Sequence, residues 1–75
     1  MHQITLRMAR EACGYTVEKA SKCFGISERI LEGFEQDSGP VPFSLMLRIT
    51  DSYHIPFDFV YFGPEIEYIE RNLRG

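Results

Sequence analysis

Glycine and proline residues interrupt this 75-residue chain repeatedly, and these breaks limit what it can fold into. Gly14 and Gly25 each follow a short helical pattern, where glycine is the usual left-handed residue after a helix end. The run 37–42 contains two prolines and a glycine, so it cannot be regular helix. Pro56 and the pair 63–64 add two further breaks. Between the breaks, apolar residues recur every three or four positions, which predicts an all-α domain of short helices.

The expected helices cover residues 3–13, 16–24, 27–36, 42–53, 56–62 and 65–73. Thr16 and Ser27 stand at the starts of the second and third helices, where a hydroxyl can accept a hydrogen bond from a free backbone N–H. Each helix has an apolar stripe that we expect to form the core. The main stripes are Leu6, Ala9 and Cys13; Val17, Ala20 and Phe24; Ile30, Leu31 and Phe34; and Phe43, Met46, Ile49 and Tyr53. We expect one domain over residues 1–63 and a helical extension over residues 64–75.

The composition is typical of a packed globule, with 44% hydrophobic and 13% aromatic residues. The longest apolar run is far below the ~20 residues of a membrane span, and the segment after Met1 lacks the apolar stretch of a secretory signal. We therefore expect a cytoplasmic protein with no membrane partner. Cys13 and Cys23 are then expected to be free thiols. They do not form a metal-ligand spacing with His2 or His54, so no metal or cofactor is expected.

The net charge of −3 is unevenly distributed along the chain. Residues 1–26 have a balance of +2, whereas residues 27–75 have a balance of −5. A protein that binds duplex DNA usually presents a basic face to the phosphates. The charge distribution therefore counts against nucleic-acid binding by the second part of the chain.

Four parts of the chain match, in order, the pattern of one known family. They are Arg10–Thr16; the turn Phe24–Ser27; Leu31, Phe34 and Glu35; and the run Tyr53–Asp58. Over roughly residues 4–63 the chain resembles the helix-turn-helix domain of phage repressors, Cro proteins and their bacterial relatives, the xenobiotic-response-element family. The resemblance implies a compact five-helix, lambda-repressor-like fold. It also implies a sequence-specific DNA-binding transcription regulator, such as those of phages, prophages or mobile elements.

The chain departs from the family pattern at several positions. Asp37 stands where the family has a glycine, and aspartate tolerates a left-handed backbone better than most residues. His54 also stands at a helix end where the family has glycine. Ala20 and Ser21 replace a leucine and an alanine, so the second helix packs with smaller groups.

The resemblance also implies which residues carry the function. It pairs Arg10 with Glu35 as a structural brace, and it puts the helix 27–36 in the major groove. The Arg29 fork matches the O6 and N7 acceptors of guanine, and Glu28 or Glu32 can accept from N4 of cytosine. The implied base contacts are Ser27, Glu28, Arg29, Glu32 and Gly33, and the implied phosphate contacts are Thr16, Val17, Lys19, Lys22, Gln36 and Ser38.

Other interpretations stay open at this stage. Two acids against one base is an unusual balance for a surface that approaches phosphates. The same fold could instead serve protein–protein contact, as in an adaptor or an antirepressor. Lys19 and Lys22 would then be a solvated helix face, and Arg10 and Glu35 could be solvated surface charges. An enzyme is not expected, because the chain has no nucleophile–base pair, phosphate-binding glycine loop or metal-ligand set.

The C-terminal part of the chain carries a second apolar pattern. Phe62, Ile66, Ile69 and Leu73 repeat at intervals of four, three and four residues. This spacing is typical of a helix that packs against another helix. The stripe could form a homodimer contact that sets the distance between two DNA half-sites, or it could cover the domain's own core.

Overall fold

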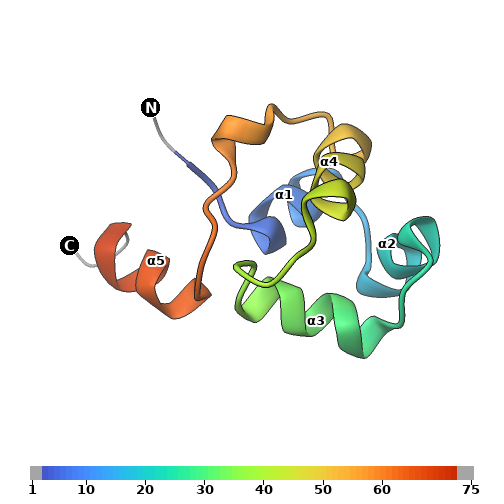
Figure 1. The fold of residues 1–75 in the computed structure, drawn as a ribbon, viewed down its shortest axis with the longest axis horizontal. Helices are drawn as coiled ribbons and strands as arrows, with labels where there is room; N and C mark the ends of the chain where they lie inside the picture. Colours follow the sequence, from blue (N-terminus) through green and yellow to red (C-terminus); the bar gives the residue numbers. More distant parts are fainter. Residues whose placement is uncertain (1–2, 73–75) are drawn as a thin grey trace.

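The computed structural model describes residues 3–72 and is all-helical, with five α-helices and one 3₁₀ turn in this range (Figure 1). The elements in chain order are α1 (Leu6–Ala12), α2 (Val17–Phe24), α3 (Glu28–Gln36), α4 (Phe43–Ser52), η1 (Phe57–Phe59) and α5 (Glu65–Asn72). Strand pairing over residues 3–72 is limited to two isolated bridges, Ile4 with Val60 and Asp37 with Pro64. The all-α prediction is confirmed.

The first helix begins later than predicted. Thr5 is the N-cap of α1, and its hydroxyl accepts a hydrogen bond from the backbone N–H of Met8 at 3.1 Å. The preceding residue, Ile4, is extended because it pairs with the segment after η1. Its N–H donates to the carbonyl of Phe59 at 2.8 Å, and its carbonyl accepts from the N–H of Tyr61 at 2.9 Å. This long-range pairing prevents the helix from starting at residue 3.

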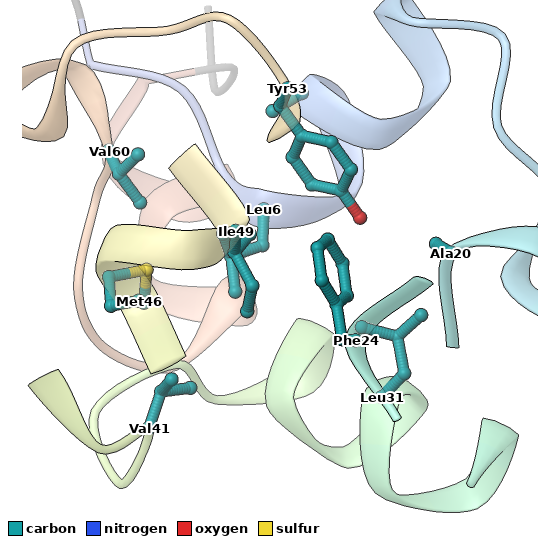
Figure 2. Packing of buried hydrophobic residues seen from close by; sticks show 10 residues of the cluster. Leu6, Ala20, Phe24, Leu31, Val41, Met46, Ile49, Tyr53 and Val60 are labelled. Carbon is teal, nitrogen blue, oxygen red and sulfur yellow. The ribbon is translucent and has the colours of Figure 1, made fainter. Parts of the chain in front are cut away.

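The core lies where α1, α2, α3 and α4 meet the extended segment that follows η1 (Figure 2). Figure 2 shows Leu6, Leu31, Met46 and Ile49 pointing into this space, and Val60 closes one side of it. The ring of Phe24 meets that of Tyr53 edge-on, with 5.6 Å between centroids. The core therefore joins the first helix to the extended segment at Val60, more than fifty positions further along the chain.

Two predicted core residues are exposed. Ile30 is 47% exposed and Phe43 is 65% exposed. Successive helix positions are about 100° apart, so Ile30 and Glu35 lie on opposite sides of Leu31, and only one of them can turn inward. Glu35 takes the inner position because Arg10 pairs with it. Phe43 lies in the first turn of α4, outside the core, and packs on the ring of Phe57 instead, at 5.3 Å between centroids.

The predicted fifth helix over residues 56–62 is wrong. Only a 3₁₀ turn, Phe57–Phe59, forms there, and Val60 is extended with φ −94° and ψ 129°. The pairing of this segment with Ile4 uses backbone groups that a helix would need. The chain then reaches α5, which lies at the opposite end of the molecule from α2 (Figure 1). α5 buries Tyr68, whose hydroxyl donates to the carbonyl of Gln3 at 2.7 Å.

Asp37 and His54 stand where the family has glycine, and their backbones adopt different conformations. Asp37 is extended, with φ −151°, rather than left-handed, and its carboxylate accepts from the N–H of Gly39 at 3.0 Å. His54 has a positive φ of 58°, the conformation for which glycine is usually preferred.

Within residues 3–72, no helix has the length and the apolar character that crossing a membrane would need.

Candidate nucleic-acid interface

The helices α2 and α3 pack together at one end of the molecule (Figure 1). We call residues 16–36, which hold both helices and their caps, the α2–α3 unit. The hydroxyl of Thr16 accepts from the N–H of Lys19, and that of Ser27 accepts from the N–H of Ile30, each at 3.1 Å. Gly25 joins the helices with a left-handed φ of 69°. These caps depend on local residues, which is why sequence analysis predicted the starts of both helices.

The residues expected to contact bases all lie at the surface of α3 or at its N-cap. Ser27, Glu28, Arg29, Glu32 and Gly33 are exposed. Leu31 and Glu35, by contrast, are 1% and 3% exposed and hold the helix to the core. Among residues 3–72, none of the ion pairs involves Arg29. The outward side of α3 is therefore a solvent-facing surface that carries one arginine, Arg29, and two glutamates, Glu28 and Glu32.

Most residues expected to contact phosphate are exposed on α2, at its N-cap or at the end of α3. Thr16, Lys19, Lys22 and Gln36 are exposed, whereas Val17 is half-buried against the core. The Lys19 ammonium lies 5.0 Å from the centre of the Tyr15 ring, a cation–π distance. The Lys22 ammonium lies 3.8 Å from a carboxylate oxygen of Glu18, and both side chains are largely exposed. Surface pairs of this kind contribute little to stability, so both lysines remain available to an anion.

Ser38 does not belong to this surface. Its side chain is buried, with the residue 4% exposed. Its hydroxyl donates to the carbonyl of Tyr61 at 3.0 Å and accepts from the N–H of Gly63 at 3.1 Å. The expected phosphate contact at Ser38 is therefore wrong, because both hydrogen-bonding capacities of the hydroxyl tie the loop after α3 to the segment before α5.

The structure brings Arg10 of α1 and Glu35 of α3 together. Arg10 Nε donates to Glu35 Oε2 at 2.6 Å and Arg10 Nη2 donates to Glu35 Oε1 at 3.2 Å. Arg10 Nη1 donates to the carbonyl of Tyr15 at 2.8 Å. The side chains are 8% and 1% exposed, so the pair is buried. The guanidinium thus links α1, α3 and the turn before α2.

Arg7 extends this link to α5. Arg7 Nε donates to Glu65 Oε2 at 2.8 Å, and Arg7 Nη1 lies 4.0 Å from Glu35 Oε1. The hydrogen bond to Glu35 raises the pKa of Arg10, and the hydrogen bond to Glu65 raises the pKa of Arg7, each above the ordinary value for arginine. Both guanidinium groups are therefore charged under all conditions in which the protein is folded. This network is structural and holds α3 at a fixed orientation.

The C-terminal apolar stripe is exposed where the structure describes it. Phe62, Ile66 and Ile69 are 40%, 59% and 39% exposed, and Leu73 lies outside the described residues. Tyr68 is the residue of α5 that packs against the domain. The three described residues therefore do not cover the domain's own core, which was one of the two uses expected for this stripe.

Three aromatic rings that contact one another near the surface were not predicted from the sequence. The ring of Phe57 lies between those of Phe43 and Phe62, at centroid distances of 5.3 and 5.1 Å. These residues come from α4, η1 and the segment before α5, so no single helical stripe contains them. The only sequence signal is the position of Phe43 in a first turn, directly after Pro42, where a side chain can project beyond the core.

The remaining chemistry-bearing groups are isolated from one another. Cys13 and Cys23 are free thiols, and Cys23 is exposed. In the part of the chain that the structure describes, His, Cys, Asp and Glu side chains form no cluster of three or more that could hold a metal ion.

A scan against protein-family models and a search of curated protein sequences found no match to this chain.

Proposed function

We propose that this protein is a sequence-specific DNA-binding transcription regulator of the phage repressor and Cro type, in which the α2–α3 unit is the helix-turn-helix. In this proposal α3 enters the major groove, and α2 lies across the backbone. The observation that carries the proposal is the outward surface of α3. Five residues at its N-cap and along one side face solvent, and the buried Arg10–Glu35 pair fixes the helix from behind.

Arg29 is the principal base-contacting residue in this proposal. Its guanidinium is exposed, and its fork can donate to O6 and N7 of one guanine. Glu32 lies on the same surface and can accept from N4 of a cytosine. Phosphate contacts come from Lys19, Lys22 and the hydroxyl of Thr16 at the start of α2.

The acidic residues predict an unusual dependence on salt. Glu28 and Glu32 repel phosphates at close range, so only a few phosphates are neutralised. We expect about four neutralised phosphates in a dimer, at Lys19 and Lys22 of each copy, and hence a shallower fall of affinity with salt than the six to ten contacts of a strongly basic protein give. Specificity then depends mainly on base contacts.

We propose that the C-terminal stripe joins two copies of the chain. Three exposed apolar residues, Phe62, Ile66 and Ile69, lie at and before α5, which is remote from α2 (Figure 1). A two-fold contact there would leave both α3 helices free and would set the spacing of two half-sites. A monomeric mass by sedimentation at high micromolar concentration would contradict this contact.

A selection from random duplexes with the purified protein tests the DNA-binding function. We expect a recovered palindromic motif that contains guanine, and a loss of at least tenfold in affinity for Arg29→Ala, since one good bidentate contact contributes ~1–3 kcal/mol of discrimination. Arg71→Ala is the matched control, because Arg71 is also an exposed arginine and lies in α5, outside the α2–α3 unit. Failure to recover any motif at low salt would refute the proposal.

A second function is favoured by one specific observation. Two exposed glutamates, Glu28 and Glu32, share the surface of α3 with a single arginine, Arg29, and the whole chain has a net charge of −3. Such a surface suits a basic protein partner, as for an adaptor or antirepressor. The duplex selection distinguishes the two functions, because a protein-binding surface would yield no sequence motif.

A further inference from the structure

One large apolar residue is exposed at one edge of the outward surface of α3. Ile30 is 47% exposed, and it lies on the opposite edge of this surface from Glu32, because the two are two positions apart on the helix. Its side chain is not needed to fill the core, where Leu31 is 1% exposed at the next position. About half of this isoleucine is therefore open to water, and it belongs neither to the core cluster nor to the residues packed against that cluster.

The neighbouring position on the same surface has no side chain at all. Gly33 lies three residues after Ile30, one turn further along α3, so the two are adjacent on the helix. A Cβ added at Gly33 would have no neighbour within 4 Å, and its φ is not in the left-handed region. Glycine is among the poorest residues for a helix interior, and nothing in the fold requires it here. The bare backbone permits another molecule to approach α3 closely.

Ile30 and Gly33 together form an apolar step beside the Arg29 guanidinium. In the major groove, thymine is the only base with a methyl group on its edge, and apolar side chains contact that methyl. A cytosine at the same place would present N4–H₂ to Ile30, which cannot accept a hydrogen bond. We propose that this step receives the C5-methyl of a thymine. The inference rests on the proposed function and adds one recognised base to it.

The proposal specifies the order of bases in each half-site. Arg29 and Ile30 are consecutive residues on one helix, and base pairs along DNA are 3.4 Å apart. The thymine therefore lies within about two base pairs of the guanine that Arg29 contacts. Glu32 faces the opposite side of the surface from Ile30, so it contacts a different base pair.

The test replaces thymines of the selected duplex one at a time with deoxyuridine, which removes only the methyl group. Affinity is measured by fluorescence anisotropy. We expect the wild-type protein to lose about fourfold in affinity at one thymine per half-site, the effect of one methyl group leaving apolar contact. Ile30→Ala should bind the thymine duplex more weakly and should no longer distinguish thymine from deoxyuridine there.

Two further variants test the surface itself. Leu47→Ala is the matched control, because Leu47 is 45% exposed on α4 and lies outside the α2–α3 unit. It should keep the wild-type response to deoxyuridine. Gly33→Ala should melt at the same or a higher temperature, because alanine favours the helix. It should bind the selected duplex at least about tenfold more weakly, because the added methyl prevents close approach.

The outcomes separate this inference from the function on which it rests. Recovery of no motif overturns both. A clear motif, with no thymine whose methyl group matters, overturns the thymine contact and leaves the DNA-binding function standing. An equal deoxyuridine penalty in wild type and in Ile30→Ala also overturns it, because the methyl would then be recognised by another residue. Unchanged affinity of Gly33→Ala overturns the part assigned to Gly33.

Discussion

Replacing Arg10 with methionine should destabilise the fold strongly, because it leaves the Glu35 carboxylate buried without its main partner. That carboxylate is 1% exposed and accepts two hydrogen bonds from Arg10. Methionine preserves much of the apolar stem of arginine, so the change removes the charge more than the packing. The carbonyl of Tyr15 also loses its donor, Arg10 Nη1, at 2.8 Å.

The expected loss is about 3 kcal/mol of unfolding free energy. Removing one member of a buried ion pair typically costs about 3–5 kcal/mol. Arg7 Nη1 lies 4.0 Å from Glu35 Oε1 and offsets part of that cost, so the lower end applies. For a domain of this size each kcal/mol lowers Tm by about 4–8 °C, and the expected fall in Tm is therefore about 12–24 °C.

Urea denaturation followed by circular dichroism measures this change. The double variant Arg10→Met with Glu35→Met removes both charges and should recover most of the lost stability. Arg71→Met at an exposed site is the matched control and should stay within about 0.5 kcal/mol of wild type. An unchanged midpoint for Arg10→Met, or a double variant no more stable than the single one, would refute the reasoning.

Three other predictions concern single side chains. Tyr53→Phe should stabilise the fold by about 1 kcal/mol in urea denaturation, because the Tyr53 hydroxyl is buried without a hydrogen-bond partner in the described chain. Burial also raises the pKa of Tyr53 above its ordinary 10.0, so folding favours the neutral hydroxyl. The stability that depends on this neutral form is complete below pH 10 and is lost as the pH rises above 10. The loss of stability at alkaline pH should therefore be smaller in Tyr53→Phe. Ile66→Glu, at a residue 59% exposed, should shift the sedimentation mass from dimer to monomer, and the monomer should keep the helical circular dichroism spectrum of wild type. Cys23 should react with a thiol reagent in the native protein faster than the half-buried Cys13, and equal rates would contradict the packing of α1.

Local signals in the sequence determined α2 and α3 and the residues at which they start. Gly14 and Gly25 adopt φ of 77° and 69°, and Thr16 and Ser27 cap the helices that follow them. Such features involve residues a few positions apart, so they depend little on the rest of the fold. The same holds for the stripe in α4, where Met46, Ile49 and Tyr53 are buried as the helical spacing predicts.

The tertiary structure decided which of two neighbouring residues faces the core and which polar groups are buried. Arg10, twenty-five residues away, draws Glu35 inward, and Ile30 is consequently left in solvent. Ser38 is buried because two backbone groups from the segment before α5 bind its hydroxyl. Helical spacing predicts that apolar residues face the core and that polar residues face solvent. A buried ion pair or a buried hydroxyl departs from this rule, because its partner is distant in the sequence and is brought close only by folding.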